Sequence, residues 1–131
     1  MIKSGILNPH ILSLIARVRH TNMLVISDKG FPFWPMIETV DISLVDGIPT
    51  VLQVLEAIRP NFNFGEVYMA EEFLTHNPIE IQQKFALSAG ELASAIQHEP
   101  HIDFKKRVPA AIGLIRTGDT IPYANMILVS A

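Results

Sequence analysis

Apolar residues recur along the chain at two spacings, and segments of the two kinds alternate. The first segment has helical spacing and comprises Ile11, Leu14, Ile15 and Val18. Asn8 and Pro9 precede it, and they supply a capping side chain and a proline suited to the first helical position. We therefore expect a helix from residue 9, with Arg17 and Arg19 in its last turn, where cations suit the helix dipole.

The second apolar segment is short and continuous, as in a buried strand. It covers residues 23–26 and is followed by an Asp-Lys-Gly turn sequence. Residues 31–35, Phe-Pro-Phe-Trp-Pro, predict an aromatic loop, because two prolines fix φ and remove backbone donors. Residues 39–44 alternate like a strand, and Asp46 with Gly47 predicts a turn.

Helical spacing returns after this turn. Pro49 predicts a helix start, and its apolar positions are Val51, Leu52, Leu55 and Ile58. Pro60 predicts the end of that helix, and residues 62–69 are expected to be extended.

A longer helix is expected next. Asn77 and Pro78 repeat the helix-start pattern, and Glu80 completes a capping box. The apolar stripe of this helix consists of Ile81, Phe85, Leu92 and Ile96. We expect the helix to continue to about Gln97, because Pro100 breaks the pattern only after that point.

The last third of the chain predicts one short helix and two strands. Residues 101–107 suit one or two helical turns, and residues 110–115 and 126–129 suit buried strands separated by a turn at 117–119. Repeats, low-complexity segments and linker-like stretches are absent from the sequence. The alternation predicts an α/β fold, with one domain over residues 1–131 and a central sheet flanked by helices.

Composition adds the expectation of an oligomer. The chain has 131 residues, of which 49% are hydrophobic, and its mean hydropathy is +0.30. Small domains have much surface to cover, so this apolar excess suggests a buried interface between subunits. An aliphatic α/β core is the simpler alternative.

Charge and residue usage exclude several classes of function. Ten basic and thirteen acidic residues give a net charge of −3 without a basic stripe, which argues against a nucleic-acid partner. The lack of cysteine excludes disulfide and thiolate chemistry. No apolar stretch is long enough to span a bilayer, and the N-terminus lacks a signal-peptide layout. We expect no membrane partner and a cytoplasmic location.

Two candidate catalytic residues flank the first predicted strand. His20 is expected at the carboxyl end of the first helix, where the dipole favours a protonated imidazole suited to general acid catalysis. A capping or surface histidine is the alternative. Asp28 follows the strand, where α/β proteins bind ligands, but it equally suits a turn-capping carboxylate.

Candidate binding residues occur in the last third of the chain. His101 and Lys105 share one face if their segment is helical, although scattered exposure would also explain them, and His98 competes with His101. Tyr123 and Asn125 point to the same side if their segment is extended. Tyrosine packing beside a turn asparagine is the alternative.

Other common chemistries lack their motifs. The sequence contains no His-Glu-x-x-His, and residues 98–101, His-Glu-Pro-His, are interrupted by proline, so we expect no metal. The glycines are too far apart for a phosphate-binding loop, and no serine lies in a nucleophile-elbow pattern.

Taken in order, several stretches form a specific set. They are Leu7-Asn8, His20-Thr21, Leu24 to Asp28 with Gly30 and Pro32, Gly47-Ile48-Pro49, Ala70-Glu71-Glu72, His76-Asn77-Pro78, His101 with Phe104-Lys105, Ile115 to Gly118, and Pro122 to Asn125. With this set the chain resembles the RbsD/FucU family of ribose pyranases and fucose mutarotases over nearly its whole length. It is closer to the D-ribose pyranase branch, whose Pro-Tyr-Ala-Asn it keeps at 122–125.

The resemblance implies a fold, an assembly and an activity. Members interconvert ring and anomeric forms of a free monosaccharide without a cofactor. They adopt a three-layer α/β/α fold with a central mixed sheet, and they form ring-shaped oligomers, typically decamers, with sites shared between subunits. This chain is therefore expected to be a homo-oligomeric isomerase acting on a ribose-like sugar. A non-catalytic sugar-binding or transport-accessory protein is the alternative.

The resemblance also assigns roles to residues. It implies that His20 moves the proton and that the Asp28 carboxylate binds and orients the sugar. The second histidine falls on His101 rather than His98, since its spacing to Tyr123 matches the family. The sugar-binding residues beside Asp28 are then His101, Lys105, Tyr123, Ala124 and Asn125. We expect the His101 group to come from a neighbouring subunit.

Three departures from the family pattern concern the site. Arg19 and Asn22 stand where the family often has glycine and aspartate. The aromatic loop at 31–35 is bulkier than usual, so it is expected to reshape the pocket and to offer a ring for stacking on a sugar face.

Overall fold

The core of the protein is one mixed β-sheet. A computed structural model describes residues 1–90 and 96–131. In this part of the chain six strands have the order β2-β5-β1-β6-β3-β4. They are β1 Met23–Ser27, β2 Glu38–Asp41, β3 Phe64–Ala70, β4 Ile96–Glu99, β5 Gly113–Arg116 and β6 Met126–Ser130. Strand β5 is parallel to β1 and β2, β3 is parallel to β4, and β6 runs antiparallel between β1 and β3.

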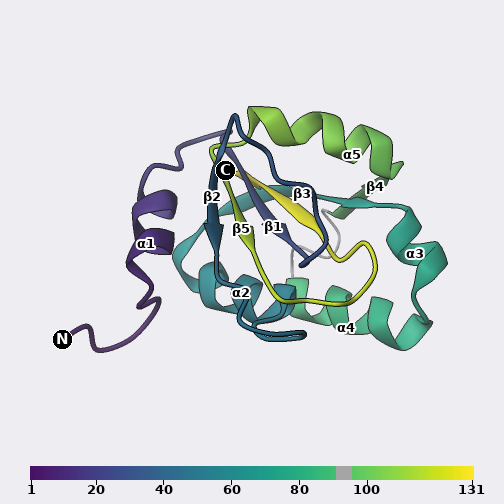
Figure 1. Ribbon diagram of the computed structural model, residues 1–131, viewed down its shortest axis with the longest axis horizontal. Helices are drawn as coiled ribbons and strands as arrows, with labels where there is room; N and C mark the ends of the chain where they lie inside the picture. The colour runs from purple at the N-terminus through teal and green to yellow at the C-terminus, as the bar shows by residue number, and fades with distance from the viewer. Residues whose placement is uncertain (91–95) are drawn as a thin grey trace.

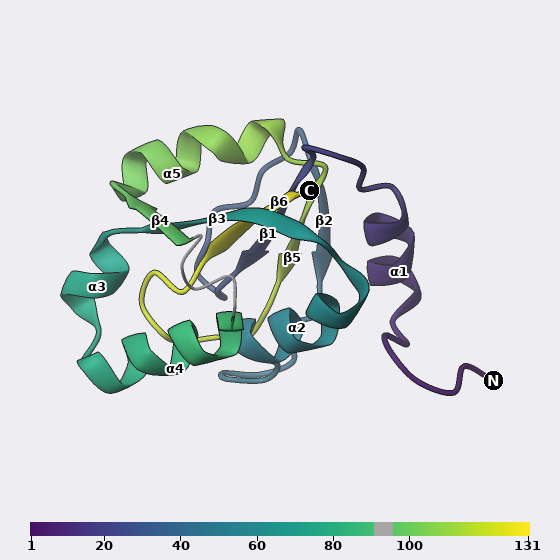
Figure 2. The same cartoon turned by 180° about the vertical axis from the view of Figure 1, so that it is seen from behind.

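Helices cover both faces of this sheet. They are α1 Pro9–Ala16, α2 Val51–Ile58, α3 Glu72–His76, α4 Ile79–Ala89 and α5 His101–Arg107, with 3-10 turns η1 Arg59–Asn61 and η3 Val108–Ala110. Helices α2 and α4 lie across the sheet from α5, as both views show (Figures 1 and 2). The predicted α/β fold with a central mixed sheet between helices is confirmed. In the described residues no helix is long and apolar enough to cross a membrane.

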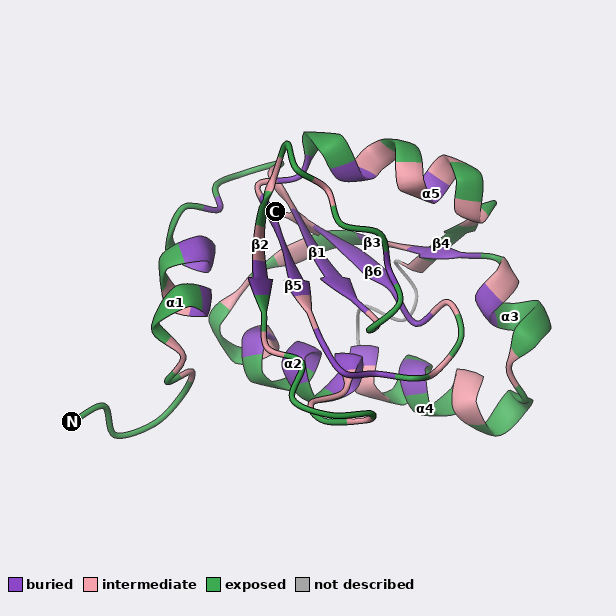
Figure 3. Ribbon diagram, in the orientation of Figure 1, coloured by how far each residue is buried: buried purple, intermediate pink, exposed green. Residues whose placement is uncertain are grey.

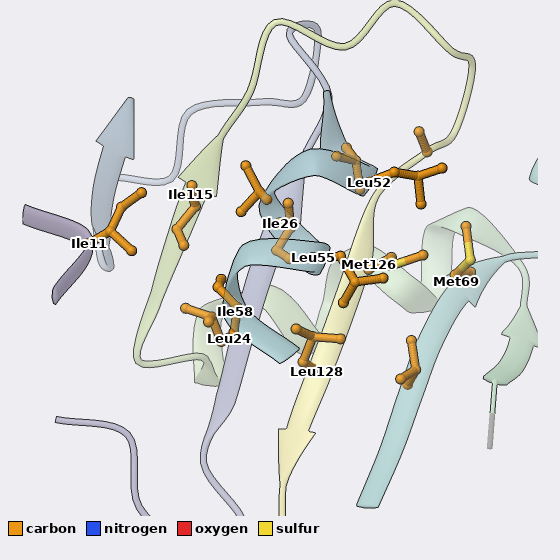
Figure 4. Packing of buried hydrophobic residues seen from close by; sticks show 14 of the residues in the cluster. Ile11, Leu24, Ile26, Leu52, Leu55, Ile58, Met69, Ile115, Met126 and Leu128 are labelled. Atoms are coloured by element: carbon orange, nitrogen blue, oxygen red, sulfur yellow. The ribbon is translucent and has the colours of Figure 1, made fainter. Parts of the chain in front are cut away.

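Strand geometry divides the apolar residues between the two faces. Leu24 and Ile26 point into the cluster beneath α2 (Figure 4), whereas Val25 between them joins the cluster beneath α5. On β5 the same alternation places Ile115 with the first cluster and Leu114 with the second. The central strands are thus buried on both faces (Figure 3), which explains their continuous apolar sequences.

A buried turn after β5 connects the central elements. The Thr117 hydroxyl donates to the Ser27 carbonyl over 2.7 Å. The Asp119 carboxylate accepts the N–H groups of Val51 and Ile121, both over 2.9 Å. Asp119 thereby satisfies a free donor at the start of α2 and fixes the chain that leads toward β6.

We expect Gly118→Ala to lower the free energy of unfolding by about 2–3 kcal/mol, the upper part of the range for overpacked sites. A Cβ at this position would lie 2.4 Å from the Val45 carbonyl oxygen and 2.6 Å from that of Ile48. Both are backbone atoms, so neither can rotate away. Urea denaturation measures the change. Gly30→Ala is the control, because its Cβ meets only an ordinary 3.8 Å contact. Equal stability of the two variants would contradict the clash.

The first helix is shorter than the sequence predicted. Helix α1 ends at Ala16 with Arg17 as its C-cap, so the prediction of Arg17 and Arg19 in its last turn was wrong. The N–H groups of Arg17 and Val18 bond to carbonyls three residues back, which tightens and ends the helix. His20 lies in the following turn, beyond the reach of the helix dipole.

The predicted helix to Gln97 was also wrong. Helix α4 ends at Ala89, where Gly90 adopts φ +59°, and Ile96–Glu99 pairs with β3 as an edge strand. Leu92 lies among residues 91–95, outside the described part. The predicted capping box is not formed: the N-cap residue is Pro78, which has no capping side chain, and the Asn77 amide donates to the Phe73 and Pro122 carbonyls, both over 2.9 Å.

Two predicted strands are shorter than expected. Strand β2 ends at Asp41, whose carboxylate accepts the N–H and hydroxyl of Ser43 and so turns the chain. Strand β5 begins at Gly113, since Val108–Ala110 forms a 3-10 turn. Helix α3 was not predicted at all.

Candidate active site

Four predicted site residues meet at one end of the sheet. Asp28 follows β1 and His101 follows β4, whereas Asn125 precedes β6, which runs in the opposite direction. All three therefore reach the edge where open α/β sheets bind ligands. Together with Tyr123 they line a cavity of about 230 Å³. Drug-sized ligands occupy roughly 300 Å³ or more, so this cavity suits a small molecule.

The Asp28 carboxylate is oriented by its own turn. Its Oδ1 accepts the Gly30 N–H over 3.0 Å, and the Asp28 N–H donates to Asn125 Oδ1 over 2.8 Å. Burial raises the pKa of Asp28 above its usual value, and hydrogen bonds from the backbone of Gly30 and Phe31 and from the Asn125 side chain oppose that rise. The carboxylate is thus partly desolvated but well supplied with donors.

Arg116 fixes the loop that forms the floor of this cavity. Its guanidinium donates to the carbonyl oxygens of Phe31 over 2.6 Å, Lys29 over 3.2 Å and Pro32 over 3.3 Å. Five donors in one planar group allow a single side chain to hold several carbonyls. This gives the Ile-Arg-Thr-Gly stretch at 115–118 a role beside the cavity.

The His101 imidazole is enclosed by aromatic rings. Ring centroids of Phe31, Phe104 and Tyr123 lie 6.1, 5.9 and 5.1 Å from its own. Burial lowers the pKa of His101 and nearby Lys105 lowers it further, while the charges of Glu72 and Asp28 raise it. The ring is consequently neutral at pH 7. Its Nδ1 is buried and has no hydrogen-bond partner among the described residues.

Glu72 anchors the backbone of His101. Both of its carboxylate oxygens accept the His101 N–H, over 3.0 and 3.1 Å. Helix α5 begins after Pro100, which offers no capping side chain, so Glu72 replaces the missing cap from outside the helix. The sequence offered no sign of this contact, because Glu72 and His101 are 29 residues apart.

The segment with Tyr123 and Asn125 is a turn, not the extended chain assumed in the sequence analysis. Tyr123 adopts φ +56°, and the turn brings both residues to the cavity. Ala124 between them is fully buried in the core beneath α2 and does not line the cavity. The Asn125 side chain is buried beside Asp28.

Lys105 and the aromatic loop form a neighbouring groove. Phe33, Trp34 and Ile102 line it with Lys105, and its volume is about 330 Å³. Pro32 lines both the groove and the cavity of Asp28. The bulky loop therefore shapes the rim between the two.

His98 does not share this cavity. It lies on β4 and lines an apolar cavity against α4, with Met69 and Phe85 among its neighbours there. Burial lowers its pKa. The structure thus favours His101 over His98 as the second histidine.

His20 lies at the opposite end of β1 from Asp28. It borders a different cavity, with residues 61–63, the C-terminus and α1. The intervening five-residue strand is about 16 Å long at roughly 3.3 Å per residue. We expected the His101 group to come from a neighbouring subunit. That expectation was wrong with respect to Asp28, because Asp28 and His101 line one cavity of the same chain. His20 is the residue that stands apart.

Comparison with known proteins identifies the family. The chain matches the RbsD / FucU transport protein family over residues 1–131. It belongs to the RbsD/FucU family. Among its relatives, the D-ribose pyranase of Laribacter hongkongensis is 37% identical over 99% of this chain and 97% of its own length. That of Exiguobacterium sp. is 40% identical over 98% of this chain and 95% of its own.

Solved structures of RbsD/FucU proteins share the fold. Bacillus subtilis RbsD, complexed with D-ribose, superimposes with a TM-score of 0.90 at 31% identity, covering 100% of this chain and 98% of its own. The fucose mutarotase of Streptococcus pneumoniae, complexed with L-fucose, gives 0.74 at 19% identity, covering 95% and 92%, which shows likeness of fold alone.

The cavity of this RbsD/FucU chain is built for hydroxyl groups. It combines a carboxylate acceptor, an amide, a phenol and a neutral imidazole in a small volume. In the described part of the chain no three His, Asp or Glu residues gather closely enough to hold a metal ion. The supporting contacts of Glu72, Arg116 and Asp119 were not predicted from the sequence, because they depend on pairings between distant segments.

Proposed function

We propose that the protein is a sugar mutarotase of the D-ribose pyranase type, an isomerase that interconverts ring forms of a free, ribose-like monosaccharide without a cofactor. The curated relatives named D-ribose pyranase and the ribose complex of the similar Bacillus subtilis protein support it. The observation that carries the proposal is the meeting of Asp28, His101, Tyr123 and Asn125 in one small cavity at the strand ends.

The chemistry requires only positioned proton donors and acceptors. A cyclic sugar is a hemiacetal, so opening it needs a proton on the ring oxygen and removal of one from the anomeric hydroxyl. The open aldehyde then closes through another hydroxyl or from its other face. Placed acid–base groups accelerate such steps roughly 10²–10⁴-fold.

Each cavity residue suits one part of this task. Asp28 accepts sugar hydroxyls, and the Asn125 amide holds both the Asp28 turn and a hydroxyl. The His101 imidazole lines the cavity and offers a ring nitrogen to a sugar hydroxyl. Tyr123 contributes its phenol. Lys105 lines the adjoining groove and contacts the sugar from there, whereas the contact of the buried Ala124 that the family resemblance implies stays a prediction.

We further propose that the proton-moving His20 comes from a neighbouring subunit. It lies at the far end of β1, so it reaches a cavity with Asp28 only if one copy packs its His20 end against the cavity end of another. Head-to-tail contacts of this kind build rings when the rotation between copies closes. The decameric size and the cytoplasmic location expected from the sequence stay predictions.

We expect sugar affinity to be constant from pH 8 to about 6.5 and to fall in more acidic solution. Burial lowers the pKa of His101 below its usual 6.5, so its ring becomes protonated only in more acidic solution than an ordinary histidine. The pKa of Asp28 is raised from 3.8, so it loses its charge earlier than an ordinary aspartate. Both groups therefore lose their binding forms as pH falls. Calorimetric titration with D-ribose measures this, and affinity that rises below pH 6.5 would contradict the neutral ring.

Saturation-transfer NMR on ribose, fucose and related free sugars tests the proposed function. Faster exchange between ring forms at catalytic protein concentration supports the isomerase. Saturable binding without any change in exchange rate across the panel would instead identify a sugar-binding or transport-accessory protein. Light scattering on the same samples tests the shared site, since a stable monomer at micromolar concentration cannot assemble it.

A further inference from the structure

The ring of Tyr123 contacts two histidine rings. The centroid of His101 lies 5.1 Å from that of Tyr123, with the planes at 80°. The centroid of His76 lies 4.9 Å from it, with the planes at 53°. His76 is the last residue of α3 and does not border the cavity that Tyr123 and His101 line. Any effect of His76 on a ligand there must act through the Tyr123 ring.

The backbone of Tyr123 needs external support. A bulky residue at φ +56° is strained and persists only where its surroundings hold it. Asn77, directly after His76, provides part of this support, because its amide donates to the Pro122 carbonyl over 2.9 Å. The end of α3 thus contacts this turn twice. The Asn77 amide bonds to Pro122, and the His76 ring packs on Tyr123.

The orientation of the His76 ring is itself fixed. Its Nδ1 lies 2.9 Å from the Glu72 carbonyl oxygen and 3.0 Å from the Thr75 hydroxyl. A carbonyl only accepts, so Nδ1 carries the proton and donates to it. Glu72 meanwhile binds the His101 N–H through its carboxylate. Helix α3 therefore supports both histidines that contact Tyr123, His76 as its own last residue and His101 through the Glu72 carboxylate.

We propose that His76 is a positioning residue for the sugar site: its ring packs on the Tyr123 ring and presents the phenol to the ligand. This inference rests on the proposed function and assigns a role to a side chain outside the cavity. Loss of the ring contact frees the Tyr123 side chain, so sugar binding weakens while the rate of proton transfer is unchanged.

The kinetic test compares three variants in the full-length protein. His76→Ala is expected to raise KM for D-ribose about 3–10-fold and to leave kcat within about twofold of the wild type. The change in KM corresponds to the free energy of one aromatic contact. His76→Phe keeps a ring and should stay within about twofold of the wild type in KM. His10→Ala, an exposed histidine on α1, is the control and should change neither constant.

An NMR test reads the contact without any sugar. The chain has two tyrosines, so ring-labelled tyrosine gives two sets of signals. His76→Ala should shift the Tyr123 signals, because a neighbouring aromatic ring has been removed. The Tyr68 signals should stay unchanged, since that ring packs under the Arg107 guanidinium at 3.8 Å.

The outcomes separate this inference from the proposed function. A raised KM in His76→Ala, its rescue in His76→Phe and a selective Tyr123 shift support the positioning role. An unchanged KM, equal losses in both variants, or unmoved Tyr123 signals would overturn it. If the wild type exchanges no sugar, the proposed function fails, and the Tyr123 signals still decide whether His76 orients that ring.

Discussion

Asp28→Asn is expected to lower kcat/KM for sugar ring exchange by about 100-fold. The substitution removes the charged acceptor from a cavity where the carboxylate is partly buried. Hydrogen bonds to charged groups contribute up to about 3 kcal/mol, which corresponds to roughly that factor. The fold should survive, because an asparagine oxygen can still accept the Gly30 N–H that Asp28 Oδ1 now accepts.

A matched substitution controls for the loss of charge alone. Asp46→Asn removes an exposed carboxylate that pairs with Lys29 outside the cavity, and it should leave exchange unchanged. Rates are measured by magnetisation transfer, and thermal unfolding checks both variants. If a folded Asp28→Asn protein exchanged sugar at the wild-type rate, the Asp28 carboxylate would have no part in the reaction.

His20→Ala is expected to cut exchange by about 10²-fold or more while the oligomer stays intact, as for the loss of a general acid or base. His20 is exposed in the single chain and far from the cavity of Asp28. Its removal should therefore leave sugar affinity much less affected than the exchange rate. His10→Ala serves as the control, and unchanged exchange by His20→Ala would remove His20 from the mechanism.

Mixing the two inactive proteins tests whether the site is shared. Co-refolding equal amounts of His20→Ala and Asp28→Asn chains gives sites that draw each residue from a different subunit. If His20 and Asp28 come from neighbours, about one quarter of the sites have both native residues, and activity returns to that fraction. If both residues came from one subunit, every site would lack one of them and activity would not return.

Much of the sheet could be predicted, because its signal is local. Residues 23–26 and 126–129 are apolar throughout, as expected for strands buried on both faces, and both form central strands. These two strands differ from prediction by one residue at most. The helix start was predicted at Pro49, whereas α2 begins at Val51 after the cap of Thr50, whose side chain and that of Gln53 form a capping box.

Other boundaries depend on partners far along the chain. Ile96 continues the apolar stripe of α4 by spacing, yet it pairs with Val67 on β3. The Asn77 amide could have capped α4 but bonds to Pro122, 45 residues away. Periodicity within one segment contains no information on such competing contacts.

Part of the predicted site comes together, whereas His20, Lys105 and Ala124 do not line the same cavity. Asp28, His101, Tyr123 and Asn125 meet, although Tyr123 reaches the cavity through a left-handed turn rather than an extended strand. His20 and Asp28 flank one strand, and the length of that strand already separates them. The rise of about 3.3 Å per residue in a strand already predicts that these two residues lie too far apart to share a site within one chain.

The most direct measurement of the central claim is the pyranose–furanose exchange rate of D-ribose, with wild-type protein and with Asp28→Asn at equal concentration. If the chain is a mutarotase that acts at this cavity, the wild-type rate rises in proportion to protein concentration and the variant rate stays near that of ribose alone. Ribose that binds the wild type saturably while exchanging at its uncatalysed rate would contradict the account.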